Sequence, residues 1–99
     1  MENWTREQWE KQKRQSKQVL FYLYTPICGT CQVASKMMTV IDTMKENLPI
    51  GKADLNYMKD IAYDYKIESV PCLLIAENGE LKEKIYAFQS IPYLLEKIG

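Results

Sequence analysis

Two cysteines separated by two residues are the side chains of this sequence best suited to chemistry. Cys28 and Cys31 lie in residues 24–31, which read YTPICGTC, with Gly29 and Thr30 between them. A dithiol at this spacing can exchange disulfides with a substrate or supply two ligands to a metal ion. Two thiols can also simply pack in a core. The composition and the surrounding elements must decide between these three uses.

The remaining composition favours redox chemistry over a metal site. Structural zinc normally takes four ligands, whereas this chain has no histidine and only Cys72 as a further cysteine. Three cysteines cannot pair completely, which argues against a disulfide framework. We therefore predict no bound metal and no cofactor. An alternative stays open, in which Cys28, Cys31 and Cys72 form a redox-sensing or metal-binding module.

The cysteine pair lies between a predicted strand and a predicted long helix. Residues 19–24 are an unbroken apolar and aromatic run, typical of a strand that is covered on both faces. Apolar residues then recur every three or four positions, which predicts one buried helix face. This face comprises Val33, Met37, Val40, Ile41, Met44 and Leu48.

A cysteine at the start of that helix is suited to a two-step exchange. The free N–H groups and partial positive charge of a helix N-terminus favour a thiolate, so the pKa of an exposed Cys28 should fall below that of free cysteine. The Cys28 thiolate would attack a substrate disulfide, and Cys31, one turn later, would resolve the mixed disulfide. We therefore predict Cys28 as nucleophile and Cys31 as resolving cysteine.

An additional helix is predicted ahead of the first strand. Residues 3–17 have a helical pattern, with Thr5 and Gln8 as a capping box. Trp4 and Trp9 are its only apolar anchors. We therefore expect this N-terminal helix to pack as a peripheral element.

Strands alternate with helices in the rest of the chain. Asn56 and Ser90 are predicted helix caps, and Asn78-Gly79 predicts a hairpin between the last two strands. The later strands are predicted over residues 50–55, 72–76 and 81–88. Strands linked by helices run parallel, and a hairpin adds an antiparallel edge, so we predict a mixed four-stranded sheet flanked by helices.

The composition predicts an ordinary globular domain with neither a nucleic-acid nor a membrane partner. Of the 99 residues, 46% are apolar and 26% are charged, as in soluble proteins. Thirteen basic residues balance thirteen acidic ones, so no overall field attracts nucleic acid or an anionic membrane. The apolar run at 19–24 is far shorter than the about 20 residues of a membrane span. We expect a cytoplasmic protein, in which close cysteine pairs are more often catalytic or metal-binding than structural.

The cysteine segment resembles the active-site motif of the thioredoxin family. YTPICGTC is similar to the family's W-A-P-W-C-G-P-C and keeps the proline two positions before the first cysteine. Asn78-Gly79 falls at the family's hairpin turn. The family's A-x-x-Y-x-I-x-x-x-P spacing is matched by Ala62, Tyr65, Ile67 and Pro71.

This resemblance implies a thioredoxin-like α/β fold in a single domain over residues 1–99. We expect the thioredoxin core over residues 19–98 and the peripheral helix within residues 1–18. The implied activity is that of a thiol–disulfide oxidoreductase acting on disulfide-containing protein substrates. A reductase or a low-molecular-weight thiol would supply its electrons.

The resemblance also implies a substrate-binding surface around the pair. The family counterpart of Pro71 is a cis-proline packed against the disulfide, and the residue before it, here Val70, offers backbone hydrogen bonds to a substrate strand. Ile27, Gly29 and Thr30 complete the expected surface. Thr30 replaces the family's proline and Ile27 its tryptophan, so redox potential and substrate contacts are expected to differ.

Three auxiliary residues follow from further comparison with the family pattern. Tyr22 stands where the family buries an aspartate that helps move the proton of the second cysteine, and Lys52 keeps the position of that aspartate's lysine neighbour. Core packing is the preferred interpretation of Tyr22. Cys72 follows Pro71 directly, where the family generally has threonine. Its default role is packing, and the alternatives are a second disulfide partner for Cys28 or a third metal ligand.

Overall fold

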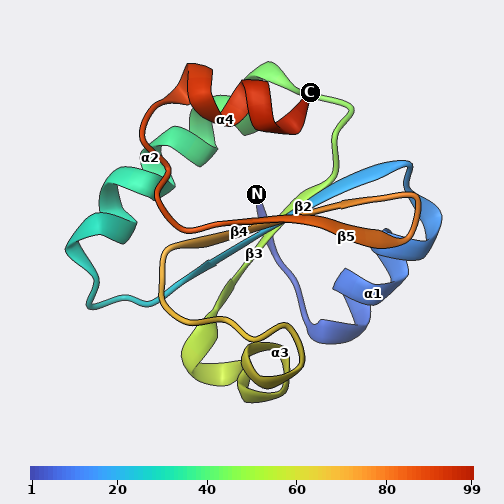
Figure 1. The fold of residues 1–99 in the computed structure, drawn as a ribbon, viewed down its shortest axis with the longest axis horizontal. Helices are drawn as coiled ribbons and strands as arrows, with labels where there is room; N and C mark the ends of the chain where they lie inside the picture. Colours follow the sequence, from blue (N-terminus) through green and yellow to red (C-terminus); the bar gives the residue numbers. More distant parts are fainter.

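A five-stranded mixed sheet runs through the computed structural model, which describes residues 1–99 (Figure 1). In spatial order the strands are β1 (Glu2–Asn3), β3 (Ile50–Asp54), β2 (Gln18–Tyr24), β4 (Cys72–Glu77) and β5 (Glu80–Ile85). β3 pairs in parallel with β1 and β2, whereas β4 runs antiparallel to β2 and β5. The predicted fold class is confirmed, with one strand more than predicted.

The additional strand lies at the very start of the chain. Glu2 and Asn3 pair with Gly51 and Lys52, and the N–H of Trp4 donates to the Lys52 carbonyl oxygen at 2.9 Å. The predicted helix start at residue 3 is therefore wrong. Glu2 and Asn3 carry no apolar alternation, so their strand conformation depends on the neighbouring strand rather than on local pattern.

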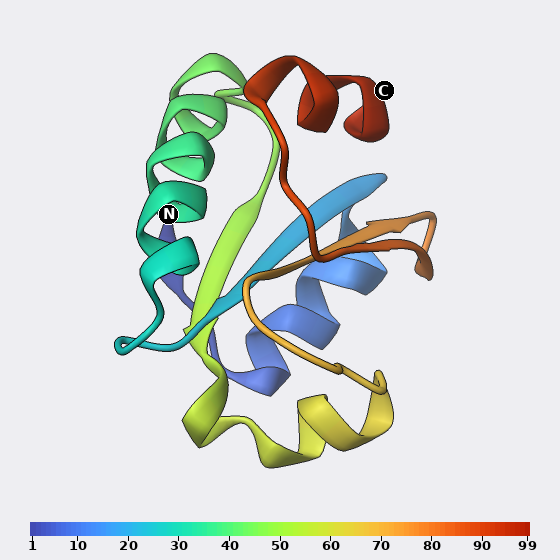
Figure 2. The same ribbon diagram turned by 60° about the vertical axis from the view of Figure 1, so that its left-hand side comes forward.

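Helices cover both faces of the sheet. α1 (Arg6–Gln15) and α3 (Lys59–Asp64) lie on one face, and α2 (Gly29–Met44) and α4 (Ile91–Ile98) lie on the other (Figures 1 and 2). None of these helices combines the length and apolar character needed to cross a membrane.

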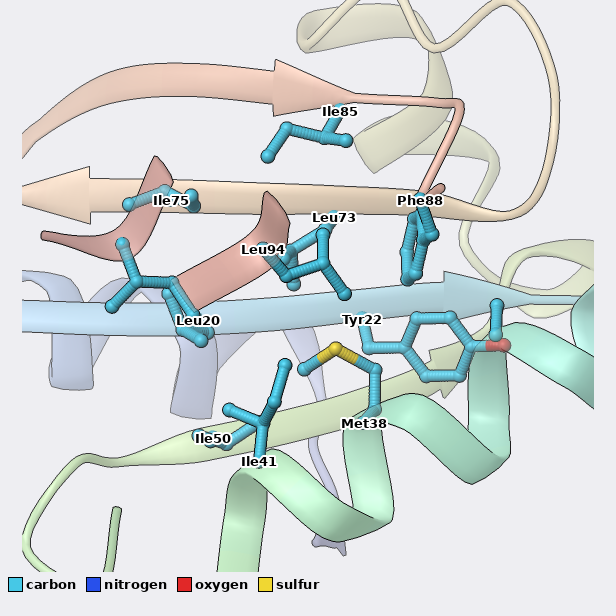
Figure 3. Packing of buried hydrophobic residues seen from close by; sticks show 12 residues of the cluster. Leu20, Tyr22, Met38, Ile41, Ile50, Leu73, Ile75, Ile85, Phe88 and Leu94 are labelled. Carbon is cyan, nitrogen blue, oxygen red and sulfur yellow. The ribbon is translucent and has the colours of Figure 1, made fainter. Parts of the chain in front are cut away.

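Two hydrophobic cores follow from the alternation of side chains along β2. Leu20 and Tyr22 belong to the core under α2 and α4, where Met38 and Leu94 meet the sheet (Figure 3). The alternate residues of β2, which are Val19, Phe21 and Leu23, belong to the core under α1 and α3. An unbroken apolar strand is thus explained by burial on both faces.

The N-terminal helix closes the second core and is more than a peripheral element. Trp9 is completely buried and stacks on Phe21 with 5.0 Å between ring centroids. Its Nε1 donates a hydrogen bond to the Tyr65 hydroxyl at 3.0 Å. The predicted capping box of Thr5 and Gln8 is confirmed, and the helix begins at Arg6.

The buried face of α2 differs from the predicted one. Of the six residues predicted to form it, Ile41 alone is fully buried, while Met37 and Leu48 pack partly against the core. The face that meets the sheet is formed by Cys31, Ala34, Met38 and Ile41. This helix carries two apolar stripes, and the sheet covers the one containing the smaller Ala34.

The later elements confirm two local predictions and correct two. Asn78 and Gly79 both adopt positive φ, as a tight hairpin requires, and the Ser90 hydroxyl caps α4. Asn56 caps no α-helix, because a 3₁₀ turn over Leu55–Tyr57 precedes α3. The last strand ends at Ile85 rather than at residue 88, and the following segment carries Phe88 into the first core.

Candidate functional site

Cys28 and Cys31 lie where β2 leads into α2. Cys28 is the N-cap residue of α2 and Cys31 lies in its first turn. The two form a disulfide, with 5.1 Å between their Cα atoms. Cys28 is half-buried, whereas Cys31 is only 3% exposed. The pair therefore presents one accessible sulfur and one covered sulfur.

Donors converge on the accessible sulfur. The backbone N–H of Cys31 donates to Cys28 Sγ at 3.1 Å, and the Thr30 hydroxyl oxygen lies 3.3 Å from the same atom. These groups and the partial positive charge of the helix N-terminus stabilise negative charge on an N-cap atom. In the reduced protein the same donors would favour a thiolate at Cys28.

The loop before β4 lies beside this sulfur. The Val70 carbonyl oxygen is 3.9 Å from Cys28 Sγ, and the Val70–Pro71 peptide bond is cis. Ile27 is almost fully exposed, and no atom approaches the position a Cβ would take on Gly29. Ile27, Gly29 and Thr30 thus flank Cys28 along the chain. Val70 and Pro71, the other two residues expected to form the substrate surface, lie in the segment beside its sulfur.

An apolar cavity of about 430 Å³ adjoins the pair. It runs between the start of α2 and the segment after β5, and no charged residue lines it. Its walls include Thr30, Val33, Met37, Val70, Pro71 and Phe88. Val33 and Met37 were predicted as core residues and Phe88 as part of a strand. The signal that would have placed Val33 and Met37 here is the second apolar stripe of α2.

A larger cavity, of about 950 Å³, lies at the opposite end of β2 from the cysteines. Its lining is mostly polar and includes Lys17, Lys45 and Glu77. None of its lining residues contacts either cysteine, whereas Thr30 and Val70, which line the smaller cavity, lie beside Cys28 Sγ, so size alone does not identify the site. The cavity that adjoins the disulfide is the one relevant to exchange chemistry.

Tyr22 lies beneath the first turn of α2. Its hydroxyl donates to the Cys31 carbonyl oxygen at 2.9 Å and lies 2.8 Å from the Ser35 hydroxyl, and Figure 3 shows its ring among the core residues. Burial raises the pKa of Tyr22 above its ordinary value. Lys52 Nζ lies 5.9 Å from the ring centre of Tyr24, and the structure gives it no contact with the cysteines.

Cys72 is in a different environment from the pair. It is fully buried in the core under α1 and α3, the face of the sheet opposite α2. Burial raises the pKa of its thiol to about 12. The structure contains no group of three or more His, Cys, Asp or Glu side chains placed to hold a metal ion. Cys28, Cys31 and Cys72 are therefore not brought together as a three-thiol site.

Comparison with known sequences gives a consistent result. The family model described as Thioredoxin matches residues 1–98. "Thioredoxin-like protein YusE" of Bacillus subtilis (strain 168) is 49% identical over 79 residues, which are 80% of this chain and 74% of that protein. The thioredoxin of the same organism is 30% identical over 82 residues, covering 82% of this chain and 79% of that protein.

Solved structures show the same architecture. The oxidized form of mitochondrial thioredoxin 3 from Saccharomyces cerevisiae superimposes with a TM-score of 0.88 at 19% identity. The match covers 99% of this chain and 92% of the yeast chain. At this level of identity the likeness concerns the fold.

Proposed function

This chain belongs to the thioredoxin family, and we propose that it exchanges disulfides with protein substrates through Cys28 and Cys31. Its enzyme class, thiol–disulfide oxidoreductase, follows from the family and from the cysteine pair. We assign the roles of the two cysteines from the contrast between their sulfur atoms. One is accessible at a helix N-cap and receives an N–H donor, and the other is buried within bonding distance of it.

The proposed exchange transfers two electrons in two steps. The Cys28 thiolate attacks one sulfur of the substrate disulfide, forms a mixed disulfide and releases the other sulfur as a thiolate. The Cys31 thiol then loses its proton to solvent, and the resulting thiolate attacks Cys28 Sγ, which forms the Cys28–Cys31 disulfide and releases the second substrate thiolate. The substrate gains two electrons, and solvent protonates its thiolates according to their pKa. The structure corresponds to the oxidised protein after this step.

The surroundings of Cys28 fit a substrate chain better than a small charged disulfide. The Val70 carbonyl oxygen lies 3.9 Å from Cys28 Sγ, which supports a role for Val70 as a backbone hydrogen-bond partner of that chain. Pro71, Ile27, Gly29 and Thr30 would provide the remaining contact surface. We propose a cytoplasmic setting, supported by the third cysteine remaining an unpaired thiol, with a reductase or a low-molecular-weight thiol restoring the dithiol.

Reduction of insulin by dithiothreitol tests the proposal. We expect the wild-type protein to accelerate the reduction and Cys28→Ser to abolish that acceleration. When pre-reduced Cys31→Ser is mixed with insulin without dithiothreitol, it should accumulate a mixed disulfide, because the resolving thiolate is missing. Equal acceleration by wild type and Cys28→Ser would refute the proposed role of Cys28, and Cys72→Ala is a matched control that should retain activity.

A further inference from the structure

The exposed flank of α2 carries an apolar stripe that no other element covers. Val33, Val40 and Met44 are 56%, 42% and 56% exposed, and Met37 between them is partly buried. Their spacing of four, three and four residues places them on one side of the helix. From Val33 to Met44 the stripe extends about 16 Å along the helix axis at about 1.5 Å per residue. Figure 2 shows α2 at the edge of the molecule, with its outer side open.

The stripe is continuous with the cavity beside the disulfide. Val33 and Met37 form its first half and also line that cavity, together with Val70 and Phe88. Residues 86–89, which follow β5, line the same cavity as the N-terminal half of α2. A substrate segment that enters the cavity to reach Cys28 therefore meets the stripe as the direct extension of the same apolar surface.

Helix formation does not explain the two valines, and solubility explains none of the four side chains. Valine is a weaker helix former than alanine, lysine or glutamate, because its branched side chain loses freedom in a helix. Exposed contiguous apolar residues generally mark an interaction surface. The only charged residues of α2 are Lys36 and Asp42, and Asp42 forms an ion pair with the N-terminal amine at 2.9 Å. Lys36, exposed beside the stripe, is therefore the one charge near a surface that is otherwise apolar, and such a surface suits an apolar partner segment.

We propose that the stripe of Val33, Met37, Val40 and Met44 is a docking surface for an apolar segment of the disulfide-carrying protein substrate. The segment lies along α2 while its disulfide meets Cys28. This inference rests on the proposed function, since exchange at Cys28 is what brings the substrate to the cavity. A disulfide of only a few atoms reacts at Cys28 without reaching Val40 or Met44, so the stripe selects for protein substrates.

The test compares a protein disulfide with a small neutral one in a single turnover. The reduced protein is mixed with insulin or with bis(2-hydroxyethyl) disulfide, and formation of the Cys28–Cys31 disulfide is followed by acid quench and mass spectrometry. For Val40→Glu/Met44→Glu we expect the rate constant with insulin to fall about tenfold, equivalent to about 1.4 kcal/mol. The rate constant with the small disulfide should stay within about twofold of the wild-type value.

The matched control is Thr39→Glu/Thr43→Glu, which adds the same charge to exposed positions of the same helix outside the stripe. It should leave both rate constants near the wild-type values. Val40→Gln/Met44→Gln, which adds no charge, should still slow the reaction with insulin. Thermal unfolding of each variant shows whether the fold is retained.

The remaining outcomes are distinct. An unchanged insulin rate in folded Val40→Glu/Met44→Glu, or an equal fall in the control variant, would overturn the docking surface. A concentration-dependent dimer of the wild type that these substitutions abolish would assign the stripe to a second copy and also overturn the proposal. If neither disulfide oxidises the wild-type protein, the proposed function itself fails.

Discussion

The three thiols of this chain occupy three environments, and their expected reactivities differ accordingly. Cys28 Sγ is accessible and accepts an N–H hydrogen bond, Cys31 is covered within the same disulfide, and Cys72 is fully buried among apolar side chains. A thiol that stays protonated at neutral pH is neither an effective nucleophile nor a metal ligand. The chemistry of each cysteine therefore depends on the local solvation of its thiol and not on residue type alone.

Cys72 should make stability depend on pH in the alkaline range. Burial raises the pKa of its thiol from 9.0 to about 12, so between pH 9 and pH 12 the unfolded state ionises and the folded state does not. The stabilisation is fully present below pH 9 and is lost as pH rises, by up to about 1.4 kcal/mol per pH unit. Urea unfolding of wild type and Cys72→Ala from pH 8 to pH 10.5 measures the difference. Parallel curves for the two proteins would contradict the assignment.

Tyr22 should stabilise the first turns of α2 through its hydroxyl. Tyr22→Phe removes the hydrogen bonds to the Cys31 carbonyl oxygen and the Ser35 hydroxyl, and we expect a loss of about 1 kcal/mol in the free energy of unfolding. A double-mutant cycle with Ser35→Ala, measured by urea unfolding, should give a coupling energy of at least about 0.5 kcal/mol. If the stability losses of the two single variants simply add in the double variant, the two hydroxyls do not interact.

At the scale of elements, local chemistry was predictable and the choice between faces was not. The Asn78-Gly79 hairpin and the Ser90 cap depend on a few neighbouring residues and were predicted correctly. The buried face of α2 was mispredicted, because two apolar stripes satisfy the same helical spacing and only the sheet decides between them. The pair β1–β3 was missed because two polar residues carry no strand signal of their own.

The docking of the N-terminal segment depends on one glycine. The ring of Trp4 occupies the position that a Cβ on Gly51 would take, so Gly51→Ala should displace Trp4 from β3 and cost about 1–3 kcal/mol. Gly29→Ala is the comparison, since its Cβ would meet open space and alanine is the better helix former. Chemical denaturation should give Gly51→Ala a clearly lower free energy of unfolding than Gly29→Ala. Equal free energies of unfolding for the two variants would contradict the packing described.

At the scale of the whole molecule, one sheet separates two cores, and the cysteine pair and Cys72 lie on opposite sides of it. Because the first core and α2 position the cysteine pair, its chemistry is insulated from the thiol in the second core. The sequence predicted this layered architecture from the alternation of strands and helices. It underestimated the N-terminal helix, because Trp9 is a single residue of α1 but is the one that the helix buries completely.

Apolar burial should hold α1 in place far more strongly than its ion pairs do. Trp9→Ala removes a completely buried side chain and should cost about 3–5 kcal/mol. Arg6→Gln removes the largely solvated ion pairs with Asp60 and Asp64 and should cost less than about 1 kcal/mol. Urea unfolding of both variants measures the two losses in the free energy of unfolding. A larger loss in Arg6→Gln than in Trp9→Ala would contradict this account of how α1 is held in place.

The whole account depends on the sulfur of Cys28 being ionised more readily than an ordinary thiol because of its place at the start of α2. The direct measurement is the rate of alkylation of the reduced protein by iodoacetamide at pH 7, with the modified residue identified by mass spectrometry. The reference is the unfolded peptide of residues 24–31 with Cys31 replaced by serine. We predict that Cys28 in the folded protein reacts about tenfold faster than in the peptide, whereas equal rates would contradict the central claim.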